Sequence, residues 1–148
     1  MGKHFQPNPD LISAANKRRV RHPESELQRN CFKLFRYQYP QFRMLYFSIP
    51  NEGVRSKGTA GIMKSQGLTS GVFDTFLAVP KYYPSNLEEV SFHGLFIEFK
   101  HGKNKLTDNQ IEFQKAAREQ GYQTAVVYTL DEFIKTINQY LNQFWRTG

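Results

Sequence analysis

The sequence has little of what holds secreted or membrane-embedded proteins together. Cys31 is the only cysteine among 148 residues, which excludes a disulfide within the chain and a zinc site built on several cysteines. No apolar run approaches the roughly 20 residues that a membrane-spanning helix needs. Residues 1–10 are polar and contain prolines, which is not the pattern of a secretory signal. We expect an intracellular protein, cytoplasmic or associated with the nucleoid, with no membrane partner.

Two common signatures of enzymatic sites are also missing. The four histidines, at positions 4, 22, 93 and 101, show no metal-ligand spacing, and no His-Glu-x-x-His motif is present. The glycine-rich segment before Lys64 lacks the glycine that must precede the lysine of a P-loop. We therefore assign no histidine to catalysis and expect no P-loop for nucleotide phosphates.

Positive charge is what the chain has in excess. It carries 20 Lys and Arg against 13 Asp and Glu, a formal net charge of +7. Such an excess favours polyanionic partners, because binding of phosphates releases their counterions. Other basic proteins, such as ribosomal proteins and chaperones, share this property, so the charge favours nucleic acid without deciding for it. Hydrophobic residues make up 39% of the chain, enough for the core of one domain.

Hydrophobic periodicity predicts alternating helices and strands after a basic arm. Residues 1–22 lack apolar periodicity and end in a basic run, which either contacts phosphates or forms a solvated tail. Helices are predicted over about 24–38, 59–66 and 108–120 and after residue 129, and strands over 44–49, 72–79, 95–100 and 122–128. Residues 80–94 are interpreted as a connection. This order predicts one domain over 23–148, an α/β sandwich with a mixed central sheet flanked by helices.

Two acidic residues stand inside the most apolar predicted strands. Asp74 lies between Phe73 and Phe76, and strand alternation places Glu98 and Lys100 on the same face of a second strand. A carboxylate in such surroundings costs several kcal/mol to desolvate unless it is paired or bound to a metal. One interpretation is therefore an ion pair with a purely structural role.

The other interpretation is a catalytic metal site. If the two strands are neighbours, both carboxylates can bind one hard cation, and Mg²⁺ suits such a site because it keeps sites for water and phosphate oxygens. Lys100 can then hold the attacking water or help to deprotonate it, and stabilise charge on the phosphate. That is the chemistry of phosphodiester hydrolysis.

The residues around these acids are similar to those of one nuclease family. Asp74, followed 24 residues later by Glu98-Phe99-Lys100, resembles the motif of the PD-(D/E)xK nuclease superfamily. The surrounding pattern resembles the virus-type replication-repair nuclease (VRR-NUC) domain from about residue 23 to 141, in the runs 24–28, 49–53 with Arg55, 64–67, 71–74, 97–100 and 106–107, and in Gln110, Gly121 and Tyr122. Phe73 departs from the family, which often has proline before the aspartate.

The resemblance implies a restriction-endonuclease-like fold, Mg²⁺ or Mn²⁺ as cofactor, and cleavage of DNA that is often branched or flapped. It makes Asp74 and Glu98 the metal ligands together with the backbone carbonyl of Phe99, and Lys100 the catalytic lysine. Glu24 and Gln110 complete the catalytic site. Members of the family that stand alone commonly act as homodimers on four-way (Holliday) junctions, so we expect a homodimer.

Two residues of this set have competing explanations. Helical periodicity places Glu24 on the same face as Cys31 and turns Glu26 away, but an acid near a helix N-terminus is also favoured by the helix dipole alone. Gln110 stands three residues after Thr107, the spacing of a capping box. We expect the side chain of Gln110 to reach the site in preference to the Thr107 amide.

The glycine-rich segment 51–71 is predicted to face DNA. Arg55, Lys57 and Lys64 would contact backbone phosphates, and Lys103 and Lys105 would extend the same surface. The alternative is a flexible, solvated loop. For the chain as a whole, two alternatives to a nuclease remain: a non-catalytic DNA-binding module on the same fold, and a structural protein with buried ion pairs.

Overall fold

The computed structural model describes residues 22–50 and 57–142, which form a mixed sheet covered by helices. The predicted basic arm, apart from His22, and Arg55 lie outside the described residues. The sheet has the strand order β1-β2-β5-β6. β1 pairs with β2 and β2 with β5 in antiparallel fashion, whereas β5 and β6 are parallel. The strands are Tyr46–Ser48 (β1), Thr75–Leu77 (β2), Leu95–Phe99 (β5) and Gln123–Val127 (β6).

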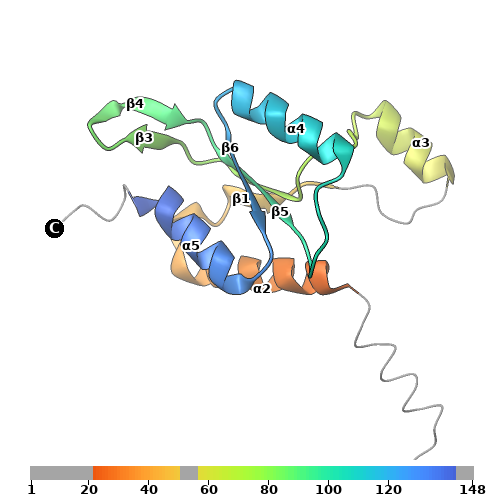
Figure 1. The fold of residues 1–148 in the computed structure, drawn as a ribbon, viewed down its shortest axis with the longest axis horizontal. Coiled ribbons are helices and arrows are strands. Elements are labelled where there is room, and N and C mark those ends of the chain that lie inside the picture. The colour runs from red at the N-terminus through yellow and green to blue at the C-terminus, as the bar shows by residue number, and fades with distance from the viewer. Residues whose placement is uncertain (1–21, 51–56, 143–148) are drawn as a thin grey trace, which may run out of the picture.

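Helices lie on both faces of this sheet, as Figure 1 shows. Helices α2 (Pro23–Gln38) and α5 (Leu130–Tyr140) contact each other on one face, and α4 (Asp108–Glu119) lies on the other. The 3₁₀ helix η1 (Pro40–Phe42) follows α2, and α3 (Lys57–Ser65) lies apart from the sheet. Among the described residues, no helix combines the length and the apolar character needed to cross a membrane. The predicted α/β sandwich with a mixed sheet and flanking helices is confirmed.

Aromatic side chains fill the space between the sheet and the pair α2 and α5. Tyr46 on β1 contacts Phe35 of α2 and Phe133 of α5, with ring centroids 4.6 and 6.1 Å apart respectively. All three are almost completely buried, and each such side chain contributes roughly 1.5–3 kcal/mol to folding by leaving water. The apolar stripes predicted from the helical spacing of α2 and α5 are the faces that form this core.

The prediction that residues 80–94 form only a connection is wrong, because this segment forms a hairpin. Its strands are Lys81–Tyr83 (β3) and Asn86–Phe92 (β4), paired as a separate two-stranded sheet with register shifts. The residues of β4 are mostly exposed, so the alternation of apolar and polar residues that marks a half-buried strand is missing there. The hairpin extends to one side of the sandwich in Figure 1.

The strand predicted over 72–79 is shorter in the structure, so Asp74 is not in mid-strand. β2 begins at Thr75, one residue after the acid. The reason is that the Asp74 N–H donates to a side chain and not to a backbone carbonyl of the neighbouring strand. Its acceptor is the carboxylate of Glu98, with 3.1 Å between N and Oε2. The Asp74 carbonyl still accepts from the N–H of Ile49, at 2.8 Å. Asp74 is thus held next to the start of β2 by contacts with Ile49, which follows β1, and with Glu98 of β5.

Gly71 fixes the approach of the chain to this point. Its φ is +87°, a conformation that residues with a Cβ rarely adopt. A Cβ added there would also collide with the backbone carbonyl group of Asn109 on α4. The neighbouring Ser70 accepts a hydrogen bond from the Asn109 amide, 2.8 Å from Nδ2 to Oγ. The loop before Asp74 is therefore seated against the first turn of α4.

We predict that Gly71→Ala destabilises the protein by more than about 1 kcal/mol, because alanine meets both the positive φ and the collision with Asn109. Urea unfolding monitored by circular dichroism measures this change. Gly61→Ala is the matched control: it lies in α3 with open space around its Cβ position, and we expect it to be neutral or stabilising. Equal effects of the two substitutions would contradict this role of Gly71.

Candidate active site

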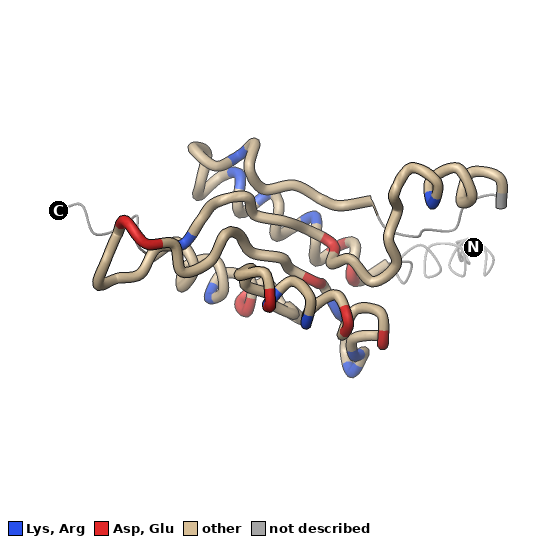
Figure 2. Tube along the Cα trace, turned by 90° about the horizontal axis from the view of Figure 1, so that it is seen from above, with Lys and Arg blue, Asp and Glu red and all other residues tan. Residues whose placement is uncertain are grey.

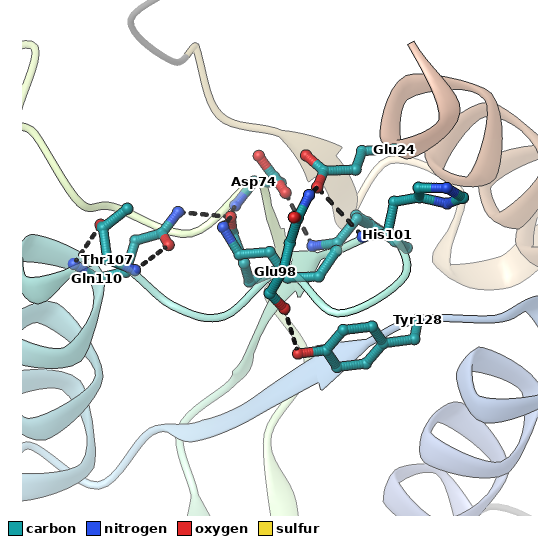
Figure 3. A network of polar contacts seen from close by, with 10 residues as sticks. Glu24, Asp74, Glu98, His101, Thr107, Gln110 and Tyr128 are labelled. Carbon is teal, nitrogen blue, oxygen red and sulfur yellow. Dashed lines mark hydrogen bonds and ion pairs between the residues drawn. The ribbon is translucent and has the colours of Figure 1, made fainter. Parts of the chain in front are cut away.

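The pairing of β2 with β5 brings two carboxylates together at one end of the sheet. Thr75 lies opposite Ile97, so continuing the antiparallel register by one residue places Asp74 opposite Glu98. Side chains of directly opposed residues point to the same face. Figure 3 shows both side chains at the centre of one network of polar contacts, and their carboxyl groups interact directly.

Backbone N–H groups fix the orientation of both acids. Oδ2 of Asp74 accepts from the N–H of Phe99 at 2.9 Å, and Oε2 of Glu98 accepts from the N–H of Asp74 at 3.1 Å. Each strand thus donates to the carboxylate of the other. Phe99 is completely buried, so Asp74 cannot turn away without leaving a buried donor unpaired, which costs about 1–3 kcal/mol. Glu98 is itself almost completely buried, and turning it away would remove the acceptor of the Asp74 N–H.

Lys100 lies next to this pair. Its ammonium nitrogen is 3.3 Å from Oε1 of Glu98, as expected from strand alternation. The lysine is only 8% exposed, which is unusual for this residue type unless it is paired. The structure therefore places one cation beside the buried carboxylate of Glu98 and the half-buried carboxylate of Asp74.

Gln110 on α4 contacts both the site and the start of its own helix. Its Oε1 accepts from the N–H of Thr107 at 2.9 Å, and its Nε2 donates to Oε1 of Glu98 at 2.5 Å. The Thr107 hydroxyl in turn accepts from the N–H of Gln110. Gln110 reaches the site as expected, but the expectation that it would do so in place of a contact with the Thr107 amide is wrong, because the two ends of one amide group make both contacts.

Glu24 reaches the same region from the first turn of α2. Its Oε1 accepts from the N–H of His101 and from Nδ2 of Asn104, each at 3.2 Å. The negative charge of Glu24 acts on Asp74, whereas Glu26 is exposed. Glu24 therefore lies at the edge of the site and ties α2 to the turn after β5, as Figure 3 shows.

Sequence reasoning missed Asn104 and Tyr128. Asn104 donates to Glu24 through its side chain and accepts from the hydroxyl of Tyr128 through its backbone carbonyl, at 2.7 Å. These contacts hold the 101–106 turn between α2 and the end of β6. A lone asparagine in a turn has an ordinary local explanation, so no signal in the sequence separates it from other turn residues.

The two carboxyl groups resist ionisation. Burial raises the pKa of Glu98 to about 7, and the charge of Asp74 adds to this effect while Lys100 opposes it. Burial also raises the pKa of Asp74, against the lowering effect of its hydrogen bond with Phe99. Two ionised carboxylates would carry more negative charge than Lys100 alone compensates, and a bound cation would relieve this repulsion.

Comparisons with known proteins identify the fold. No family model matches the chain, and no curated protein is similar enough in sequence to count as a relative. A solved structure described as a "VRR_NUC domain protein" matches with a TM-score of 0.66 at 22% sequence identity, over 81% of this chain and 88% of that chain. The chain has the VRR-NUC fold. The resemblance found in the sequence is thereby confirmed at the level of the fold.

The donor set of this VRR-NUC fold fits a hard divalent cation. Among residues 22–50 and 57–142, no cluster of three or more His, Cys, Asp or Glu side chains suits a metal ion. Mg²⁺ and Mn²⁺ instead accept one or two carboxylates and complete their shells with water and phosphate oxygens. Asp74 and Glu98, which lie side by side with raised pKa values, match this requirement.

The predicted DNA-contacting cations are spread over several segments of the VRR-NUC fold. Lys64 is exposed in the last turn of α3, and Lys103 and Lys105 are exposed in the turn after β5. Lys57 opens α3, and its side chain is not among those described. Figure 2 shows that lysines and arginines occur along many elements and are not confined to one. Their contact with DNA stays a prediction.

We predict a pH dependence of stability from the raised pKa of Glu98 in protein stripped of metal by EDTA. Below the ordinary pKa of 4.5 this carboxyl is neutral in both the folded and unfolded states. Between 4.5 and about 7 the folded state binds the proton more tightly, so stability falls as pH rises through this window.

Glu98→Gln supplies the matched control, because an amide cannot ionise. Urea unfolding from pH 4 to pH 8 should show the stability difference, wild type minus variant, falling by roughly 1–3 kcal/mol and levelling off above about pH 7. Parallel pH profiles of the two proteins would contradict a raised pKa at Glu98.

Proposed function

We propose that this chain is a metal-dependent endonuclease that hydrolyses phosphodiester bonds in DNA. The observation that carries the proposal is the placement of Asp74 and Glu98 side by side, with Lys100 beside them, on a VRR-NUC fold. The basic character of the chain, with a net charge of +7, supports a polyanionic substrate.

Asp74 and Glu98 would hold Mg²⁺ or Mn²⁺, with the backbone carbonyl of Phe99 as a further ligand. When bound, the cation would polarise the phosphoryl group and lower the pKa of water. Lys100 would hold the attacking water and donate to the phosphate oxygens on which charge develops. Its contact with Glu98 restricts the ammonium group to the side of the site where the carboxylates lie.

Glu24 and Gln110 would complete the catalytic site in different ways. Gln110 donates to Glu98 and so orients the carboxylate that faces Lys100. Glu24 adds negative charge near Asp74 and can accept a hydrogen bond from a water at the edge of the site. Both residues belong to helices, so docking of α2 and α4 on the sheet sets the geometry of the acids.

The finer part of the proposal concerns the form of the DNA and of the protein. We propose a substrate that is branched, such as a flap or a four-way junction, and a homodimer as the active form. A two-fold pair of subunits matches the symmetry of a four-way junction. Sedimentation of a single monomeric species at micromolar concentration would contradict the dimer.

We predict that Asp74→Asn and Lys100→Met each lower the rate of DNA cleavage at least about a hundredfold while leaving DNA binding largely intact. The assay incubates a flap, a four-way junction and a linear duplex with Mg²⁺, with Mn²⁺, or with EDTA. Lys115→Ala is the control, because it removes an exposed positive charge on α4 without touching the carboxylates.

Two results would overturn the proposal. Cleavage by Asp74→Asn at the wild-type rate would exclude the site. Binding of DNA by the wild-type protein with no cleavage under either cation would instead indicate a non-catalytic DNA-binding module.

A further inference from the structure

A groove outside the catalytic site runs between α2 and β1. It is open to solvent, has a volume of about 790 Å³, and takes Arg29, Lys33 and Arg36 from α2 and Phe47 and Ser48 from β1. β1 is the edge strand of the sheet among the described residues, so this side of the groove is a strand edge. The catalytic site uses none of these five residues.

The groove is strongly cationic. Arg29, Lys33 and Arg36 are spaced so that they follow one face of α2, and among the residues that the structure describes no Asp or Glu lines the groove. Within residues 22–50 and 57–142, Lys100 forms an ion pair with Glu98, and no described carboxylate forms an ion pair with Arg29, Lys33 or Arg36. Charge complementarity therefore favours a polyanion as the occupant.

Aromatic rings accompany the cations. Phe32 lines the groove and stacks on Tyr46, with centroids 4.4 Å apart and an interplanar angle of 13°. The guanidinium of Arg36 lies over Phe32, 5.4 Å from its centroid, which holds that cation in place. Phe47 is 44% exposed and contacts Phe76 edge-on, with ring centroids 5.9 Å apart. Because Tyr46 and Arg36 already pack against Phe32, the ring available for stacking is that of Phe47. Cations beside an exposed aromatic ring are features that bind single-stranded nucleic acid.

The groove begins beside the catalytic site. Ser25, which lines it, directly follows Glu24. Ser48, in the other wall, precedes Ile49, whose N–H donates to the carbonyl of Asp74 at 2.8 Å. From Ser25 to Arg36 the helix extends the groove by roughly 16 Å at 1.5 Å per residue. A strand that enters the catalytic site can therefore continue along α2.

We propose that this groove binds a single strand of DNA next to the scissile bond. The choice of DNA rests on the proposed function. A duplex fits the groove less well, because its bases are already stacked and paired and cannot use the exposed aromatic ring. A second copy of the chain related by a two-fold axis is also disfavoured, because the same cations would face each other across the interface.

The test measures binding in EDTA, where cleavage cannot occur, by fluorescence anisotropy of the full chain with a labelled oligothymidylate of about 12 nucleotides. The double variant Arg29→Ala/Lys33→Ala should weaken binding about tenfold or more. The slope of log affinity against log salt concentration should also decrease by the amount that one or two phosphate contacts contribute. The control double variant Lys115→Ala/Lys135→Ala removes the same charge from exposed positions on α4 and α5. We expect it to weaken binding about threefold or less.

A second variant tests the aromatic part of the groove. Phe47→Leu keeps an apolar side chain but removes the ring, and should weaken binding to the oligothymidylate about fivefold with little change for a blunt duplex. Unfolding curves verify that the variant is folded. If every groove variant weakens binding to the duplex and to the oligothymidylate by the same factor, the assignment of the groove to a single strand is overturned.

Three further outcomes overturn the proposal. One is equal weakening by the groove pair and the control pair, because binding would then follow net charge alone. Another is failure of the wild-type chain to bind the oligothymidylate. The third is a change in sedimentation of the groove variants with unchanged DNA affinity, which would make the groove a protein interface. Because binding is measured without metal, loss of cleavage in the Asp74 variant and loss of binding in the groove variants are independent results.

Discussion

The antiparallel pairing of β2 with β5 is the constraint on which the candidate site depends. It places Asp74 opposite Glu98 at the end of the sheet, where each acid accepts an N–H from the other strand. A shift of one residue in this register would turn one carboxylate to the opposite face. The apolar residues that set the register, such as Leu77 opposite Leu95, are completely buried, so the core determines the distance between the acids.

The polar contacts around the acids serve the fold and the site together. Gln110 caps α4 and orients Glu98 with one amide group, and Glu24 joins α2 to the turn after β5 while adding charge near Asp74. Helices α2 and α4 are thus each held in place by a side chain that also contributes to the site. The burial that raises the pKa values of the two carboxyl groups is a cost in the metal-free protein, and it is the property that would favour a bound cation.

Much of this arrangement could be predicted from the sequence where a pattern has one physical meaning. The helical spacing that ends in Phe35 predicts α2, and the alternation around Glu98 predicts β5 with Lys100 on the same face. The β3–β4 hairpin could not be predicted, because its residues are mostly exposed and carry no apolar alternation. The two contacts of Gln110 and the bridge made by Asn104 depend on tertiary placement, which local spacing does not encode. The groove along α2 is a similar case, since its second wall comes from β1.

The central claim is that Asp74 and Glu98 share one divalent cation. Crystals soaked in Mn²⁺ and measured at a wavelength with anomalous scattering from manganese test it most directly. The account predicts an anomalous peak in contact with both carboxylates, and no peak at this position in Asp74→Asn crystals. Crystals of the wild-type protein in Mn²⁺ that show no peak there, with Glu98 still paired only with Lys100 and Gln110, would contradict it.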